Sequence, residues 1–259
     1  VQDKALLEIG SGATLTMQDI DSFEHHGTRT PELTYADSGA KIVNKGTVEI
    51  QNLGFAFVTG ENTTGINSGT ISLLQNGKDP APSPIVLLAT NGGSATNAGT
   101  ITGKVTEQHS VFNKYSTGTS NSFIFNNDVS SITGLVAQSN STIINTDSGI
   151  IDLYGRGSVG MLAIADSTAE NQGKITLDSM WVDANDTTAM RDIASNSAID
   201  FGTGVRVGTD SYSGAGKNAT AINQLGGVIT IYNDGVGMAG YGASNTVINQ
   251  GTITLEKNG

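Results

Sequence analysis

The sequence predicts an all-β fold, a right-handed parallel β-helix (β-solenoid) with about 24 residues and three short strands per coil. Three observations predict it. A motif of asparagine, glycine and an aliphatic residue recurs along the chain, the motif glycines stand at regular spacing, and two further apolar patches share that spacing. The composition agrees, because 34 of 259 residues are glycine while only 5% are aromatic and 14% are charged. Such a balance is typical of many short strands joined by tight turns.

The motif reads Asn, one to three residues, Gly, any residue, then Ile or Val. Its seven copies begin at Asn44, Asn67, Asn97, Asn145, Asn171, Asn223 and Asn249, and a looser copy covers 12–17. Side chains in each copy alternate as in a half-buried strand, and a single coil has no second layer to cover its aliphatic face. We therefore expect one shared core column, formed by Val48, Ile71, Ile101, Ile175, Ile229 and Ile253.

The spacing of the motif glycines predicts the number of coils. In the regular stretches they stand 23 or 24 residues apart, whereas Gly99 to Gly149 and Gly173 to Gly227 span 50 and 54 residues. These gaps are close to two periods, so we expect each to contain a degenerate coil, with strands at 122–125 and 197–201. Some eleven coils at about 4.8 Å each then predict a rod on the order of 50 Å long.

Two apolar patches accompany each motif and predict the other two strands of a coil. One lies about ten residues before the asparagine, as at 54–57, 84–87, 158–161 and 235–238. The other directly precedes the asparagine, as at 141–144, 219–222 and 245–248.

The asparagine and glycine of the motif are expected to form a sharp corner between strands. A positive φ costs glycine little, its missing Cβ lets backbones approach, and asparagine tolerates the same backbone region. Stacked at equivalent corners, the seven asparagines are expected to form a structural ladder of hydrogen bonds, as identical amides do in cross-β stacks.

Charge and composition exclude several classes of protein. The net charge of -11 opposes binding to a phosphate backbone, so we expect no nucleic-acid partner. No apolar stretch reaches the roughly 20 residues that cross a bilayer, so we expect no membrane insertion by this segment. The chain has no cysteine, which excludes disulfides and cysteine-ligated zinc.

The motifs of known chemistry are absent or weak, and we expect no enzyme, cofactor or metal site. Two glycine-rich stretches, 155–160 and 235–240, match a dinucleotide fingerprint but lead into the next strand motif rather than a helix, so they are interpreted as repeat corners. No nucleophile elbow, zinc-protease or Walker motif occurs. The adjacent His25 and His26 would point to opposite sides of an extended chain, which favours a solvated loop over a metal site.

Segments that break the period are the expected binding loops, because insertions into a solenoid become loops on its flank. They are 18–40, 76–84, 103–121 and 178–196, the last with one or two helical turns expected at 186–194. The candidate binding residues in them are His25, His26, Arg29, Tyr35, Trp181 and Arg191. For Trp181 the alternative remains that it folds back over a coil edge.

The repeated Asn-x-Gly-Thr-Ile-x-Leu units, with Gly-Val-Gly-Met before Asn-Gln-Gly-Thr-Ile-Thr-Leu, resemble passenger domains of type V autotransporter surface proteins, most of all the large fusobacterial adhesins. The likeness covers residues 41–259 and is one of fold-specifying repeats. It implies an extracellular stalk on the bacterial surface, anchored in the outer membrane through a barrel outside this chain, and adhesion to host or bacterial cells.

We therefore expect residues 1–259 to be a single β-helix segment, a fragment of a longer passenger domain, monomeric, that binds a host or bacterial surface protein or glycan. Two alternatives remain open: a structural spacer that binds nothing, and a β-helix enzyme that degrades polysaccharide. Outward positions that are mostly threonine, serine and asparagine argue against the enzyme, which needs grouped carboxylates or basic residues.

Overall fold

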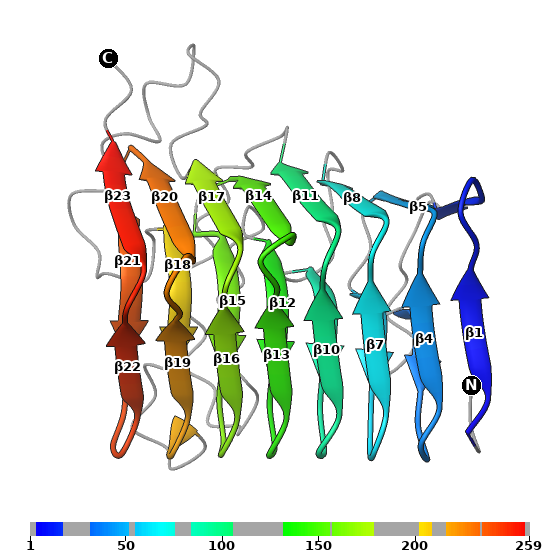
Figure 1. The fold of residues 1–259 in the computed structure, drawn as a ribbon, viewed down its shortest axis with the longest axis horizontal. Coiled ribbons are helices and arrows are strands. Elements are labelled where there is room, and N and C mark those ends of the chain that lie inside the picture. The colour runs from blue at the N-terminus through cyan, green and yellow to red at the C-terminus, as the bar shows by residue number, and fades with distance from the viewer. Residues whose placement is uncertain are drawn as a thin grey trace, which may run out of the picture.

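The computed structural model describes residues 4–17, 32–51, 55–75, 84–105, 132–155, 157–178, 202–208, 216–233 and 235–256. The strands among these residues form three parallel sheets, and successive coils stack along one axis (Figure 1). The predicted right-handed parallel β-helix with three strands per coil is confirmed. No helix among the described residues is long and apolar enough to cross a membrane.

Each full coil contributes one strand to each sheet, in the order A, B, C. Sheet A contains β1 (Leu6–Ile9), β4 (Lys41–Asn44), β7 (Thr64–Asn67), β10 (Ser94–Asn97), β13 (Thr142–Asn145), β16 (Thr168–Asn171), β19 (Thr220–Asn223) and β22 (Thr246–Asn249). Sheet B contains β2 (Thr14–Met17), β5 (Thr47–Gln51), β8 (Thr70–Gln75), β11 (Thr100–Val105), β14 (Ile150–Tyr154), β17 (Lys174–Asp178), β20 (Val228–Tyr232) and β23 (Thr252–Glu256). Sheet C contains β3 (Glu32–Ala36), β6 (Phe55–Thr59), β9 (Ile85–Ala89), β12 (Thr133–Ala137), β15 (Val159–Ala163), β18 (Gly202–Val207) and β21 (Gly235–Gly240).

The expected aliphatic column runs through sheet B. Strand register places one aliphatic residue of each coil on that of the next, in the order Leu15, Val48, Ile71, Ile101, Ile151, Ile175, Ile229 and Ile253. The column is fully buried between Val48 and Ile229. Burial of each such side chain is worth about 1.5–3 kcal/mol, so stability accumulates along the stack.

Glycines of sheet C make room for this column on the opposite side of the core. A Cβ at Gly160 would lie 2.5 Å from the Gly204 carbonyl oxygen and 2.6 Å from Cγ2 of Ile175, and one at Gly237 would collide with Ile253. These contacts explain the glycine-rich stretches of the sequence. Gly155 and Gly157 do lie at a turn, but Gly160 is in β15 and the whole of 235–240 is strand β21, so their interpretation as corners was wrong for these residues.

The seven motif asparagines form one column at the end of sheet A, buried at every position but the last, Asn249. Each Nδ2 donates to the Oδ1 of the next asparagine, over 2.7–2.9 Å, from Asn44 to Asn249. Five of these Nδ2 atoms also donate to a main-chain oxygen of the next coil, as from Asn97 to Ile150 over 3.2 Å. From Asn44 to Asn223 the amides are completely buried. The ladder therefore satisfies polar groups that would otherwise be costly inside the core.

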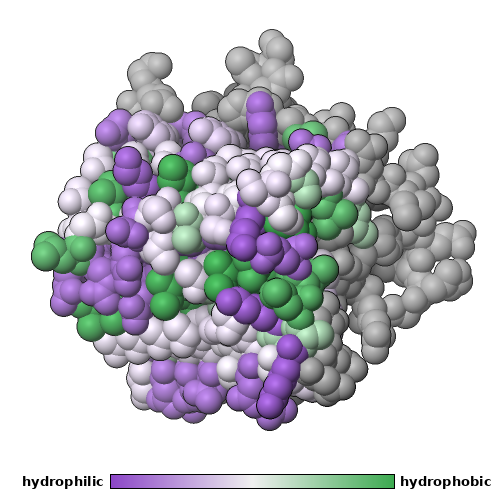
Figure 2. Space-filling view, turned by 45° about the vertical axis from the view of Figure 1, so that its right-hand side comes forward, coloured by the Kyte–Doolittle hydropathy of each residue, from purple (hydrophilic) through white to green (hydrophobic). Residues whose placement is uncertain are grey.

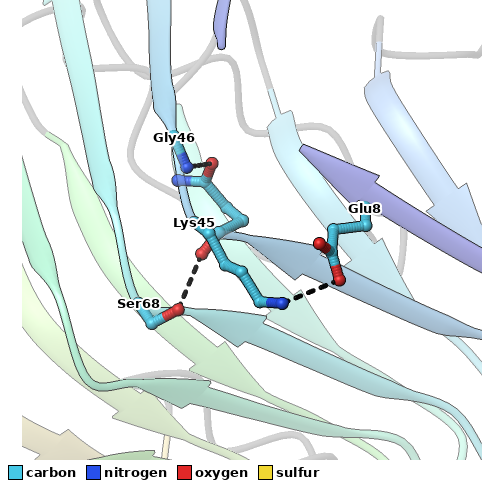
Figure 3. Close-up of polar contacts among 5 residues, drawn as sticks. Glu8, Lys45, Gly46 and Ser68 are labelled. Atoms are coloured by element: carbon cyan, nitrogen blue, oxygen red, sulfur yellow. Dashed lines mark hydrogen bonds and ion pairs between the residues drawn. The ribbon is translucent and has the colours of Figure 1, made fainter. Parts of the chain in front are cut away.

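The motif glycine after each asparagine is required for close backbone approach. A Cβ at Gly99 would collide with the Gly69 carbonyl oxygen and lie 2.8 Å from the Ser68 carbonyl carbon. None of the seven motif glycines or asparagines has a positive φ, so that part of the expectation was wrong. Figure 3 shows this corner in an early coil, where Gly46 N donates to Asn44 Oδ1, Ser68 Oγ donates to the Asn44 carbonyl, and Lys45 pairs with Glu8 over 3.0 Å.

At the two wide gaps of the repeat, no extra coil stands between the described strands of the stack. Asn97 bonds directly to Asn145, 48 residues later, and Asn171 bonds directly to Asn223, 52 residues later. The expected degenerate coils are therefore wrong, and their proposed strands at 122–125 and 197–201 lie outside the described residues. Eight stacked strands in sheets A and B span about 34 Å at ~4.8 Å per step, shorter than the rod expected from eleven coils.

Candidate functional site

Most of the long connections of the chain join sheet B to sheet C, although the link 208–219 joins sheet C to sheet A. Links from sheet A to sheet B have at most four residues. Links from sheet B to sheet C include the long segments 18–31, 76–84, 106–132 and 179–201. Lengthening a connection at a surface corner adds little to the entropic cost of loop closure, so the repeat tolerates long connections at this border. The described strand ends that flank these segments thus lie at the border between sheets B and C.

A row of outward side chains follows this border at the end of the sheet B strands. We call it the B–C edge, and strand register orders it as Gln51, Leu74, Lys104, Tyr154, Asp178, Tyr232 and Glu256. Lys104, Tyr154 and Glu256 are exposed, and the other four are half-buried. The row presents aromatic and charged side chains on neighbouring coils.

Two tyrosines flank a carboxylate at the centre of the B–C edge. Tyr154 and Tyr232 are both register partners of Asp178, so they stand two strand spacings apart, about 10 Å. Asn233 Nδ2 donates to Asp178 Oδ1 over 2.8 Å and fixes that carboxylate. Asp152 lies outward on the same strand as Tyr154, two residues earlier. The arrangement offers ring faces and hydrogen-bond acceptors to a ligand at the surface.

Burial raises the pKa of Tyr154, and the negative charges of Asp152 and Asp178 and the neighbouring Tyr232 raise it further. Because the folded chain then holds the phenolic proton more tightly than the unfolded chain, the phenol remains a hydrogen-bond donor throughout the neutral range. The stability linked to this proton is present below the ordinary tyrosine pKa and is lost as pH rises through the raised one.

This electrostatic coupling predicts the outcome of a titration. In Asp152→Asn the pKa of Tyr154 is expected to fall toward the ordinary tyrosine value, because one of the negative charges that oppose ionisation is gone. Ultraviolet titration of phenolate absorbance, with Tyr154→Phe to assign the signal, measures it. The opposite shift, or none, would contradict the geometry of the edge.

Of the candidate binding residues that the sequence analysis placed in loops, only Tyr35 lies within the described residues. Tyr35 was assigned to a loop, but it lies on β3 of sheet C, 41% exposed, with its hydroxyl donating to Asp37 Oδ2 over 3.3 Å. That assignment was wrong, because the segment 18–40 contains a strand that pairs with β6. His25, His26, Arg29, Trp181 and Arg191 lie outside the described residues, as do the helical turns expected at 186–194.

Tyr154 and Tyr232 were missed by the sequence analysis, although a signal for them exists. Each directly follows the last inward aliphatic residue of its motif strand, after Leu153 and Ile231. If the repeat alignment had been extended by one residue beyond the last aliphatic position of the motif, both tyrosines would have fallen in one outward row with Asp178. Across the described ranges, no group of three histidine, cysteine or acidic side chains is placed to hold a metal ion.

The three stacked sheets define a class of protein, the right-handed parallel β-helices, and the family match indicates within it a passenger-like segment of a surface-exposed bacterial protein. The family model of the BigA third pectate lyase-like domain matches residues 1–259, and the chain belongs to that family. No solved structure matches the chain.

Proposed function

We propose that this segment is an adhesin passenger that binds a protein or glycan of host or bacterial cell surfaces through its B–C edge. One observation carries the proposal: the described strand ends that flank four long connections, and the row from Lys104 to Glu256, lie at the same border of the stack. Solenoids commonly bind through elements that depart from the repeat, because regular coils serve as scaffold.

The chemistry of the edge supports recognition of a polar surface ligand. The rings of the exposed Tyr154 and the half-buried Tyr232 supply contact area at low entropic cost, and their hydroxyls and Asp178 supply hydrogen bonds. Aromatic residues dominate the energetics of many interfaces, so Tyr154, which is 38% exposed, is the strongest single anchor at this edge.

A binding experiment tests the proposal. Truncation of both rings, in Tyr154→Ala with Tyr232→Ala, is expected to weaken attachment of the purified segment to cells by about tenfold or more. The matched control is Leu225→Ala, which removes an 87% exposed apolar side chain from the border of sheets A and B. Tyr154→Phe with Tyr232→Phe keeps the rings and separates stacking from hydrogen bonding.

The spacer alternative makes the opposite prediction. A segment that only holds a distant binding tip away from the cell would show no saturable attachment, and the tyrosine pair would then behave like the Leu225 control. Either result counts against the adhesin proposal.

We also propose that the segment does not cleave its ligand. The outward register row of sheet B two residues before the B–C edge runs Thr102, Asp152, Thr176 and Thr230, so a single carboxylate stands among threonines. Release of unsaturated or reducing sugar ends from an acidic polysaccharide would overturn this proposal and favour the enzyme alternative.

As part of the same proposal, the protein is similar to the large fusobacterial adhesins and is anchored in the outer membrane through a barrel. Protease treatment of intact cells that carry the full protein tests the location. We expect the segment to be cleaved while the outer membrane stays closed.

A further inference from the structure

The border between sheets C and A carries a second regular feature, independent of the B–C edge. In every full turn the residue two positions before the sheet A strand adopts the left-handed backbone region, with φ between 55° and 81°. Strand register aligns these positions in one row: Gly39, Asn62, Gly92, Asn140, Asp166, Asn218 and Ser244. All members but Ser244 are glycine, asparagine or aspartate, the residue types that tolerate this conformation best.

Three members of the row begin an Asn-x-Ser/Thr triplet. They are Asn62-Thr63-Thr64, Asn140-Ser141-Thr142 and Asn218-Ala219-Thr220. Such a triplet is the acceptor signal for N-linked sugars when it lies on a surface turn of an exported protein. The three asparagines occupy alternate coils of one edge, so they stand about 10 Å apart.

The side chains of the three asparagines are accessible to an enzyme. All three are exposed, whereas the ladder asparagines from Asn44 to Asn223 are completely buried. Asn62 Nδ2 donates to Glu61 Oε1 over 3.4 Å, and Asn218 Nδ2 donates to Asp166 Oδ1 over 2.9 Å. Both contacts lie at the surface, where water replaces them at little cost.

The hydroxyl residue of each triplet is presented alike. Thr64, Thr142 and Thr220 open β7, β13 and β19 as the first outward residues, half-buried, and they occupy one register row. A transferase would therefore meet the same asparagine turn and threonine at three places along a straight edge. The rungs between them present Gly92 and Asp166, which have no carboxamide to modify.

We propose that Asn62, Asn140 and Asn218 are acceptors for N-linked sugar. A transferase would use a sugar 1-diphosphate donor, linked to a nucleotide or a lipid. The Nδ2 nitrogen attacks the sugar C1, the C1–O bond to the diphosphate breaks, and the diphosphate leaves with the bonding pair. The nitrogen loses one proton to a base of the transferase, and nothing is oxidised or reduced.

Modification here would leave the proposed binding edge open. The acceptor row lies between sheets C and A, whereas the B–C edge lies at the other border of sheet C. Sugars at alternate coils would cover the exposed turns without contact with Tyr154 or Tyr232. The test of the sugar acceptors and the test of the binding edge are therefore independent of each other.

Peptide mapping by mass spectrometry tests the proposal on the full protein, isolated from the surface of the bacterium that carries it. We expect sugar-sized mass additions on the peptides with Asn62, Asn140 and Asn218. The matched control is Asn91, exposed and also left-handed in the same border, but without a hydroxyl residue two positions later. Unmodified asparagine at all three positions, in protein from its natural surface, overturns the proposal.

Three substitutions in the Asn140 triplet separate recognition by the transferase from folding. Asn140→Asp keeps a residue type that the same row already uses at Asp166, and it is expected to abolish addition at 140 alone. Thr142→Ala is expected to abolish it as well, whereas Thr142→Ser restores it. Modification that persists in Thr142→Ala would show that the triplet is not the signal and would overturn the proposal.

Discussion

Substitution of alanine for Asn171 is expected to lower the free energy of unfolding by about 3–5 kcal/mol. Asn171 accepts from Asn145 Nδ2 over 2.9 Å and donates to Asn223 Oδ1 over 2.7 Å, both inside the core. Its removal leaves both partners buried without that bond, and each such group costs about 1–3 kcal/mol. Urea denaturation followed by circular dichroism measures the loss.

The end of the same ladder supplies the control. Asn249 accepts from Asn223 Nδ2 over 2.8 Å but is exposed, so Asn249→Ala lets water satisfy the partner. We expect a loss below about 1 kcal/mol. Equal effects at Asn171 and Asn249 would mean that the column does not depend on burial, contrary to the structure.

Gly99→Ala is the second change with a large expected effect. The added Cβ would collide with the Gly69 carbonyl oxygen and would lie 2.9 Å from the Gly69 nitrogen. Both obstacles are backbone atoms of the preceding coil, so neither can rotate away as a side chain can. The two coils must separate, and we expect a loss of about 3 kcal/mol or more.

Gly10→Ala is the matched control for this steric argument. Gly10 has an ordinary φ, and a Cβ there would meet no atom within 4 Å. We expect its stability to stay within about 0.5 kcal/mol of the parent chain. Thermal unfolding of both variants at one protein concentration compares them directly. If Gly99→Ala is tolerated as well as Gly10→Ala, the close stacking of motif corners is wrong.

The periodic motif was sufficient to predict the coil, because its alternation has a direct physical consequence. Ile175 and Ile229 need a shared interior, and only stacking of equivalent strands provides one for so short a unit. The asparagine and glycine were also recognised as a corner. Their physical roles became clear only from the structure, since a buried amide chain and a close backbone approach depend on the neighbouring coil.

The number of coils was overestimated because spacing alone cannot tell an inserted segment from a degenerate coil. A gap of 50 residues is compatible with both, and a short apolar run such as 122–125 does not distinguish them by its sequence. Strand pairing distinguishes an inserted segment from a degenerate coil, and β10 pairs directly with β13. Long insertions at a surface corner add little closure entropy, so the stack continues without them.

The sequence predicted that the candidate site lies on an insertion-bearing flank, but it did not predict which residues form it. An insertion-rich flank followed from the broken period, whereas the tyrosines of the B–C edge lie on regular strands and carry no motif of their own. Tyr154 and Tyr232 are 78 residues apart in the sequence. They become neighbours of one carboxylate only through the strand register.

A cysteine-pair experiment tests the stacking order most directly, since the chain contains no cysteine of its own. Ser94 and Thr142 are register partners across the first wide gap. At about 4.8 Å their Cα atoms are within the range of a disulfide. Thr142 with Thr168, partners across a short coil, is the positive control, and Thr64 with Thr142, two coils apart, is the negative one.

Mild oxidation followed by non-reducing electrophoresis and peptide mapping gives the result. The structure predicts that Ser94→Cys with Thr142→Cys forms a disulfide as readily as Thr142→Cys with Thr168→Cys. If that pair instead stays reduced like Thr64→Cys with Thr142→Cys, a coil lies between β10 and β13, and the stacking described for this protein is wrong.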